Sequence, residues 1–174
     1  EAIEEGIREG NQELLLAMAT GTGKTRTALG MLYRFVKYGR FQRVLFLVDR
    51  TTLGDQAMDT FSDVQVEGTY AFADVYDVKS LGDLEPESDT RVHISTVQGM
   101  VRRILHRGED EDPIPVDQYD CIIVDECHRG YNLDQELSDT ELEFRSAEQY
   151  ISKYRRVIEY FDAVRIGLTA TPAL

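Results

Sequence analysis

Cysteine is scarce in this sequence, whose 174 residues include only two, Cys121 and Cys127. Both fall in or beside one expected strand, so they form neither a disulfide framework nor a paired CxxC metal motif. No apolar run approaches the roughly 20 residues that a membrane helix needs, and no signal-peptide pattern opens the chain. We therefore expect a protein of the reducing cytoplasm without a membrane segment.

Positive charge is also in short supply, with 19 lysines and arginines against 32 aspartates and glutamates and a formal net charge of -13. Proteins that grip nucleic acid through its phosphates are usually basic, so this balance argues against a self-sufficient DNA-binding module. A motor domain that touches the nucleic-acid backbone through main-chain amides and a few hydroxyls remains compatible with it. Much of the acid lies in 109–112 and 134–143, which are expected to be solvated loops.

The chain has the length of one domain and an ordinary share of apolar residues, 42%, which is enough for a single packed core. Short apolar runs alternate with amphipathic segments, as in a parallel sheet covered on both faces. The sequence opens within an expected helix and without an initiator Met. We therefore expect residues 1–174 to be one domain of a longer polypeptide.

The apolar runs predict the secondary structure. Strands are expected over 14–18, 43–48, 73–78, 92–94, 119–124 and 164–168. Helices are expected over 2–9, 25–38, 53–61, 97–105 and 147–161. The run 43–48 is apolar enough to be buried on both sides, and loops are expected over 82–89 and 108–118.

The first motif that carries chemistry is TGTGKT at 20–25, which follows an apolar strand and opens a helix. Glycines in this setting let the backbone turn tightly, so that N–H groups point at phosphate oxygens near the positive end of the helix. Lys24 would reach the β- and γ-phosphates, and the Thr25 hydroxyl would ligate Mg²⁺. The strict pattern has Gly or Ala where Met18 stands, and the alternative is a Gly-Thr loop with a chance lysine.

The second motif, Asp-Glu-Cys-His at 125–128, closes the expected strand 119–124. Residues at the carboxyl ends of parallel strands face the ligand crevice, so both carboxylates are expected to arrive where the phosphates sit. Asp125 can hold Mg²⁺ directly or through water, and Glu126 can orient and activate the attacking water. Alone, an acid pair at a strand end is commonly just solvated, but the loop upstream makes this pair specific.

Two further features are less specific. His128 is open to two interpretations, as a catalytic or sensing group and as a structural histidine. A zinc site with the two cysteines is disfavoured, because His93 and His106 lack ligand-like spacing. The segment GLTATP at 167–172 ends the last expected strand with two hydroxyls, and a turn with local caps is its ordinary role.

With the loop, the Asp-Glu-Cys-His box and the Thr-Ala-Thr segment in this order, the chain resembles the first RecA-like domain of a superfamily 2 helicase. Longer blocks resemble the motor of type I restriction enzyme R subunits. These blocks are 18–28 (MATGTGKTRTA), 44–50 (VLFLVDR), 125–130 (DECHRG) and 134–156, and they span nearly the whole chain. Met18 fits this family's variant of the loop.

The resemblance implies an α/β, three-layer RecA-like P-loop NTPase fold, with a central mostly parallel sheet and helices on both faces. It also implies an ATP- and Mg²⁺-dependent translocase on double-stranded DNA, working with specificity and methylation subunits before the DNA is cleaved. The residues expected to bind ATP are Thr20, Gly21, Thr22, Gly23, Lys24, Thr25 and Arg26. The residues expected in catalysis are Lys24, Asp125 and Glu126, with Mg²⁺ on Thr25 and Asp125.

By the same resemblance, other segments couple nucleotide state to movement and contact DNA. The coupling residues are His128, Thr169 and Thr171. The DNA-contacting residues are Arg50, Gln56, Ser95, Thr96 and Gln98. Helix capping by Thr51 or Thr52, and by Ser95 or Thr96, is the alternative for both DNA segments.

The resemblance places several parts outside these residues: a second RecA-like domain with arginine fingers, a nuclease domain and an adenine-reading Gln. We therefore expect this chain alone to bind nucleotide weakly, hydrolyse it slowly and cut no DNA. Two alternatives remain. One is a generic superfamily 2 DNA or RNA helicase domain, against which the block 133–156 argues. The other is an inactive piece whose acidic loops bind partner subunits.

Overall fold

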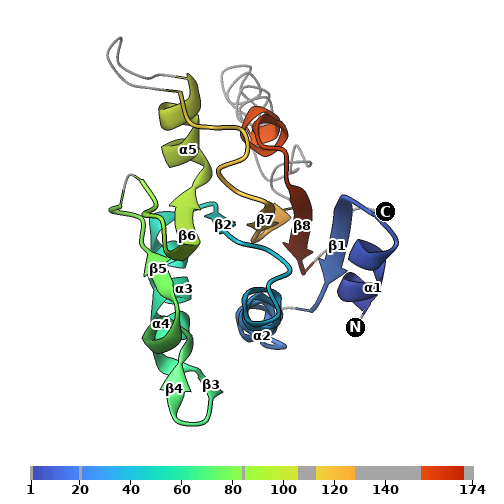
Figure 1. Ribbon diagram of the computed structural model, residues 1–174, viewed down its shortest axis with the longest axis vertical. Helices are drawn as coiled ribbons and strands as arrows, with labels where there is room; N and C mark the ends of the chain where they lie inside the picture. Colours follow the sequence, from blue (N-terminus) through green and yellow to red (C-terminus); the bar gives the residue numbers. More distant parts are fainter. Residues whose placement is uncertain (1, 20, 84, 106–112, 128–153, 171–174) are drawn as a thin grey trace, which may run out of the picture.

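The computed structural model describes residues 2–19, 21–83, 85–105, 113–127 and 154–170, and its main element is a six-stranded sheet. The strands of this sheet are β1 (Glu13–Ala17), β2 (Val44–Val48), β5 (Asp77–Lys79), β6 (Thr90–Thr96), β7 (Cys121–Val124) and β8 (Val164–Thr169). Their order across the sheet is β1-β8-β7-β2-β6-β5, and every neighbouring pair is parallel. Figure 1 shows the arrangement.

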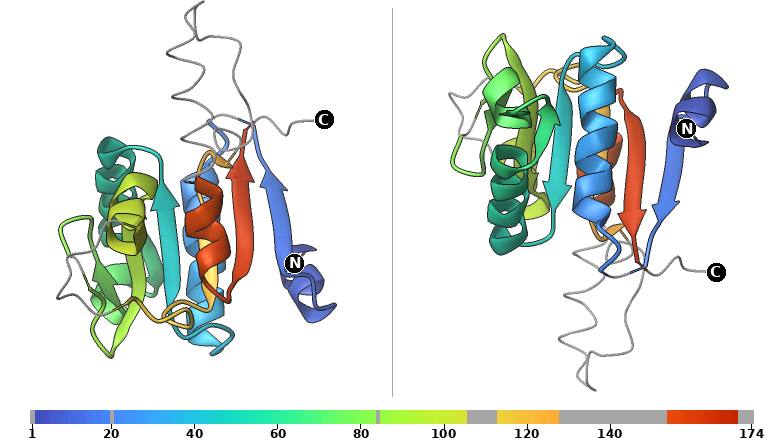
Figure 2. Two further views of the ribbon diagram at one scale, coloured as in Figure 1. Left: turned by 90° about the horizontal axis from the view of Figure 1, so that it is seen from above. Right: turned by 90° about the horizontal axis from the view of Figure 1, so that it is seen from below.

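Helices cover both faces of the sheet (Figure 2). The helices are α1 (Ala2–Arg8), α2 (Lys24–Lys37), α3 (Thr51–Asp63), the short α4 (Phe72–Val75), α5 (Val97–Leu105) and residues 154–160. The helices α2 and α3 pack on one face, where Leu32 and Phe61 meet Phe46 in a buried cluster. The helices α5 and 154–160 pack on the other, where Met100 and Val157 join a second cluster. The expected three-layer α/β arrangement is confirmed.

Strand β2 lies at the centre of the molecule, and all five of its residues are buried, as predicted. Val44 and Phe46 point into one apolar cluster, while Leu45 and Leu47 point into the other. The alternation of side chains along a strand produces this division, and a continuous apolar run is what burial on both faces requires.

The order of the strands brings distant segments of the chain to one edge of the sheet. The chain passes from edge strand β1 through α2 to β2, and later returns to insert β7 and β8 between them. In the resulting register Ala17 lies opposite Thr169, and Val124 lies opposite Gly167. Because the strands are parallel, the residues that follow β1, β7 and β8 meet at their shared carboxyl edge.

The strand predicted over 73–78 is wrong for its first half, because Phe72–Val75 forms the short helix α4. The Asp74 side chain accepts a hydrogen bond of 2.8 Å from the Ala71 N–H, which closes this turn, and Phe72 is fully buried beside Phe61. A short apolar run does not distinguish a strand from a buried helical turn.

A second sheet, which the sequence pattern did not predict, pairs β3 (Gln65–Glu67) with β4 (Tyr70–Ala71) in antiparallel fashion. Gly68 lies between the two strands with a φ of 61°, in the left-handed region that favours glycine in tight turns. In Figure 1 this hairpin lies at one end of the molecule. Its strands are short and mostly exposed, so they carry no apolar alternation for a sequence pattern to reveal.

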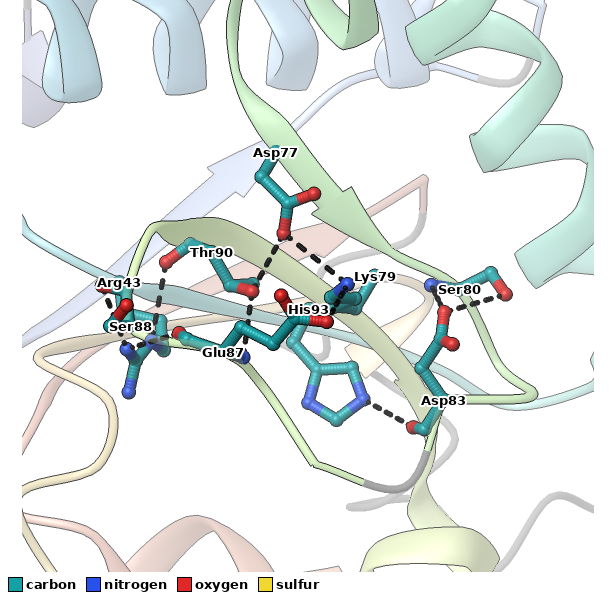
Figure 3. A network of polar contacts seen from close by, with 9 residues as sticks. All are labelled: Arg43, Asp77, Lys79, Ser80, Asp83, Glu87, Ser88, Thr90 and His93. Carbon is teal, nitrogen blue, oxygen red and sulfur yellow. Dashed lines mark hydrogen bonds and ion pairs between the residues drawn. The ribbon is translucent and has the colours of Figure 1, made fainter.

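At the amino edge of the six-stranded sheet, opposite the carboxyl edge, polar contacts hold the loop between β5 and β6 (Figure 3). The Thr90 hydroxyl donates to Asp77 Oδ2 at 2.7 Å and accepts from the Glu87 N–H at 2.9 Å. The Arg43 guanidinium donates to the carbonyl oxygens of Glu87 at 2.8 Å and Thr90 at 3.2 Å. A pocket of about 290 Å³ opens here, but the donors of Arg43 are already engaged by main-chain carbonyls.

The buried histidine of β6 is a structural residue. His93 Nδ1 lies 2.6 Å from the Tyr119 hydroxyl, and Nε2 lies 3.0 Å from the Asp83 carbonyl oxygen. Burial lowers the pKa of His93 to about 4, so its ring is neutral near pH 7. Among the described residues, no three His, Cys, Asp or Glu side chains group as a metal site, and no helix is long and apolar enough to cross a membrane.

Phe61 joins α3 to the sheet, because its ring meets both Phe46, at 6.0 Å between centroids, and Phe72, at 5.2 Å. We expect Phe61→Ala to lower the free energy of unfolding by about 3–5 kcal/mol, since it leaves a cavity in a fully buried cluster. Denaturant unfolding of the chain measures the loss. Tyr38→Ala is the matched control, because this ring is 73% exposed and its removal should change stability little.

Candidate active site

The loop after β1 has a backbone conformation that requires glycine at two positions. Gly21 and Gly23 have φ values of 79° and 85°, in the left-handed region that only glycine occupies without strain. The Thr22 N–H and hydroxyl both donate to the Ala19 carbonyl, at 3.3 and 2.6 Å. Thr20 lies outside the described residues. The chain therefore turns tightly and enters α2 directly after Gly23.

Helix α2 begins at Lys24, and its first turn carries no acidic side chain. Thr25 is half-buried at this end of the helix, whereas Arg26 is exposed. The free N–H groups and the positive end of a helix attract anions, and no carboxylate within the first turn competes for them. The loop and the helix together offer main-chain donors beside a hydroxyl and an ammonium group.

The two carboxylates follow β7 at the same edge. The Asp125 N–H donates to the Leu47 carbonyl at 2.9 Å, which continues the pairing of β7 with β2 for one more residue. At Glu126 the chain changes direction, because this residue has a φ of 51°, which is unusual for a residue other than glycine. The Glu126 N–H donates to Asp125 Oδ1 at 3.0 Å.

Lys24 joins the loop to this acid pair. Its Nζ forms an ion pair with Glu126 Oε1 and lies 3.5 Å from Asp125 Oδ1. The three side chains are partly buried, with 13% of Lys24, 11% of Asp125 and 25% of Glu126 exposed. The structure thus brings together the three residues that the sequence assigned to catalysis.

At this site one ammonium group, that of Lys24, lies beside the two carboxylates of Asp125 and Glu126. Burial raises the pKa of Asp125; Lys24 opposes this rise, and the neighbouring Glu126 charge adds to it. A divalent cation beside Asp125 would favour its charged form. The oxygen donors of Thr25 and Asp125 fit Mg²⁺, which takes few protein ligands and completes its shell with water and phosphate oxygens.

The end of β8 contacts the loop. The Thr169 carbonyl accepts a 2.9 Å hydrogen bond from the Met18 N–H, and Thr169 is 1% exposed. The other residues predicted to couple nucleotide state to movement, His128 and Thr171, lie outside the described residues. β8 therefore joins the loop after β1 through its main chain, at the strand end where a coupling residue is expected.

The residues expected to contact DNA divide into exposed and structural groups. Arg50, which directly precedes α3, is exposed, as are Gln56 on α3 and Gln98 on α5. Ser95 is 8% exposed and its hydroxyl donates to the Thr96 carbonyl, so little of it is accessible. The helix-cap alternative is confirmed for Thr96, whose hydroxyl accepts from the Gly99 N–H at 3.0 Å.

The same alternative is wrong for the start of α3. Thr51 is the first residue of that helix, Arg50 occupies the cap position, and no side chain caps the helix. Arg50 instead extends from the cap position, with its Nε 3.6 Å from Asp49 Oδ2.

The sequence patterns missed a contact between the acid box and β8. A methyl group added at Gly167 would lie 2.7 Å from Cys127 Sγ. Burial raises the pKa of Cys127 to about 11, so its thiol is protonated. A glycine inside a strand is the signal that could have revealed this contact, because it marks close approach by another part of the chain.

Comparisons of the sequence with known proteins match it to restriction enzyme subunits. The family described as "Type III restriction enzyme, res subunit" matches residues 1–174. The chain is 53% identical over 173 residues to the Type I restriction enzyme EcoKI endonuclease subunit of Escherichia coli strain K12, covering 99% of this chain and 14% of that protein. It is 35% identical over 174 residues to the EcoAI endonuclease subunit of Escherichia coli, covering 97% and 18%. These matches confirm the resemblance to type I restriction enzymes.

Solved structures agree on the fold. The Hef helicase domain of Pyrococcus furiosus has a TM-score of 0.54 and 23% identity, covering 99% of this chain and 33% of that one. The Sulfolobus solfataricus SWI2/SNF2 ATPase core in complex with dsDNA has a TM-score of 0.56 and 15% identity, covering 91% and 28%. The expected RecA-like helicase fold is confirmed.

The burial of Asp125 predicts a gain in stability when its charge is removed. The pKa of Asp125 in the folded protein lies above the ordinary 3.8. The charged carboxylate therefore destabilises the fold increasingly as the pH rises above 3.8. We expect Asp125→Asn to raise the free energy of unfolding at pH 7 without Mg²⁺ or nucleotide, and the gain to shrink as the pH falls toward 3.8. Denaturant unfolding across pH measures it. Asp59→Asn, on the exposed side of α3, should show no such gain.

Proposed function

We propose that this chain, which belongs to the Type III restriction enzyme, res subunit family, is the ATP-binding motor domain of a type I restriction endonuclease R subunit. In this role it couples ATP hydrolysis to translocation of double-stranded DNA before cleavage. The chain spans 14% and 18% of the two curated relatives. The second RecA-like domain and the nuclease are therefore assigned to other parts of a longer polypeptide.

One observation carries the proposal: Lys24 at the start of α2 contacts Glu126 and lies 3.5 Å from Asp125, at the carboxyl edge of a parallel sheet. This is the place where open α/β sheets bind ligands. A lysine, two carboxylates and a glycine-rich turn are the groups that phosphoryl transfer requires, because its catalysis consists mainly of positioning and charge stabilisation.

Each residue has a separate role in this proposal. The Lys24 ammonium exchanges Glu126 for the β- and γ-phosphates, while the N–H groups from Gly21 to Thr25 surround the phosphate oxygens. The Thr25 hydroxyl and the Asp125 carboxylate would hold Mg²⁺, which would neutralise charge on the phosphates. Release from Lys24 leaves the Glu126 carboxylate able to accept a proton from the attacking water.

The DNA contacts rest on the family and on exposure. Gln56 and Gln98 are exposed on helices that begin at the carboxyl edge of the sheet, and the exposed Arg50 directly precedes the first of these helices. The net charge of -13 favours contacts through a few such groups over a broad basic surface. We place Thr169, with His128 and Thr171, in the coupling of nucleotide state to movement. The specificity and methylation subunits are the proposed partners, and the cytoplasm is the proposed location.

The nucleotide site is tested by Lys24→Ala. We expect this variant to bind Mg²⁺·ATP about 10- to 100-fold more weakly than the unchanged chain, because it loses charge-assisted hydrogen bonds to phosphate. Calorimetric titration with Mg²⁺·ATP measures the change. Lys37→Ala, at the far end of α2, is the matched control and should bind normally. Unchanged affinity in Lys24→Ala would support the alternative of an inactive subunit-binding piece.

The choice of nucleic acid is tested in the complete polypeptide. If the chain is the motor of a type I restriction enzyme, duplex DNA should stimulate ATP hydrolysis and duplex RNA should not. The ATPase rate with each nucleic acid, at matched length and salt concentration, measures the difference. Stimulation by RNA alone would favour a generic superfamily 2 helicase.

A further inference from the structure

We infer that Cys127 is a positioning residue, which holds Glu126 in its working conformation by packing against Gly167 of the neighbouring strand β8. The inference rests on the proposed function, since it assigns a task to Glu126 in ATP hydrolysis. It adds a residue to the site that has no chemical role of its own. It also gives a reason for the glycine in the middle of β8.

The conformation of Glu126 needs support from its surroundings. Its φ of 51° lies in the left-handed region, which is unfavourable for residues other than glycine. Such a conformation persists only where neighbouring contacts favour it. The next residue, Cys127, is 6% exposed and belongs to the buried cluster beneath α5 and residues 154–160. The turn at Glu126 thus directs the following side chain into the protein.

The Cys127 side chain can occupy its position only because residue 167 is glycine. Gly167 pairs with Val124 on one side and with Leu15 on the other. A methyl group there would lie 2.7 Å from Cys127 Sγ and 3.3 Å from its Cβ. A separation of 2.7 Å between carbon and sulfur is a steric clash. The thiol therefore occupies the space in which other residues of β8 would place a side chain.

The contact connects the parts of the site through short paths. Cys127 follows Glu126 directly, and Gly167 precedes Thr169 by two residues in β8. The Thr169 carbonyl in turn accepts the Met18 N–H at the start of the phosphate-binding loop. Because the bond between Thr169 and Met18 joins main-chain atoms, movement of the Cys127 side chain leaves it intact. A shift of Cys127 would therefore displace the Glu126 carboxylate relative to Lys24 while the loop stays in place. This predicts an effect on turnover with little effect on nucleotide binding.

The test uses Gly167→Ala in the complete polypeptide. The added methyl group should push Cys127 outward and lower the kcat for ATP hydrolysis by about 10- to 100-fold, because a displacement of about 1 Å can cost about 100-fold. The KM for ATP should change by less than about threefold, because the phosphate-binding loop keeps its place. Gly30→Ala is the control, since nothing lies within 4 Å of a methyl group at that position of α2.

A double variant distinguishes displacement of Cys127 from a general loss of structure caused by Gly167→Ala. Cys127→Ala removes the sulfur that a methyl group at residue 167 would strike, and in the double variant that methyl group takes the place of the sulfur between the two segments. Gly167→Ala with Cys127→Ala should therefore recover most of the kcat lost in Gly167→Ala. Two neighbours remain. The Cβ of residue 127, at 3.3 Å, has to shift by only a few tenths of an ångström, and Leu15 Cδ1, at 3.2 Å, belongs to a side chain that is 55% exposed and can move aside. A double variant as slow as Gly167→Ala, or slower, would overturn the inference.

Labelling of Cys127 with a thiol reagent, located by mass mapping, gives a readout that does not depend on hydrolysis. Labelling should be slow in the unchanged protein and faster in Gly167→Ala, whereas the fully buried Cys121 should stay unlabelled in both. If Cys121 is labelled too, Gly167→Ala has unfolded, and Cys127→Ala alone decides: it should lower kcat with KM unchanged, and an unchanged kcat overturns the inference.

The two proposals fail in different ways. If the unchanged protein neither binds nor hydrolyses Mg²⁺·ATP, the proposed function fails. If it hydrolyses ATP normally, but Gly167→Ala changes neither kcat nor the labelling of Cys127, only the role of Cys127 fails.

Discussion

The contact of Lys24 with Glu126 and Asp125 joins residues that are about a hundred positions apart in the chain. It requires a parallel sheet in which β1, β8 and β7 are neighbours, so that a loop after the first strand meets the acids after the seventh. The buried faces of β2, the two helical layers and the crossovers serve this geometry. The proposed ATP site is the edge at which these strands end together.

Two features of this site are unfavourable for the stability of the fold. Asp125 is buried enough for its pKa to rise, and Glu126 has an unfavourable backbone conformation. Both features make sense if the site is arranged for a bound nucleotide and its cation, because groups placed for function commonly reduce the stability of the unliganded protein. By contrast, the amino edge of the sheet has its polar groups satisfied, as in the contacts of Arg43 and Thr90.

Sequence patterns could predict the layers, since β2 is a continuous apolar run and α5 has the predicted bounds. They failed where a segment is short: Phe72–Val75 is a helical turn, closed by hydrogen bonds from the Ala71 N–H to Asp74 and from the Tyr76 N–H to the Phe72 carbonyl. The motifs identified Lys24, Asp125 and Glu126, but not the pairing of Lys24 with Glu126 or the packing of Cys127 against Gly167. Such contacts depend on strand order and on free space in the core, and no spacing along the chain encodes these. The assigned roles of the site residues remain predictions.

The central claim is that a phosphate group replaces the carboxylate of Glu126 as the partner of Lys24. A crystal structure of the protein with Mg²⁺ and a non-hydrolysable ATP analogue tests this claim directly. It should show Lys24 Nζ on a phosphate oxygen, Mg²⁺ near Thr25 and Asp125, and Glu126 released toward the position of the attacking water. A nucleotide bound elsewhere, with the pairing of Lys24 and Glu126 intact, would contradict the account.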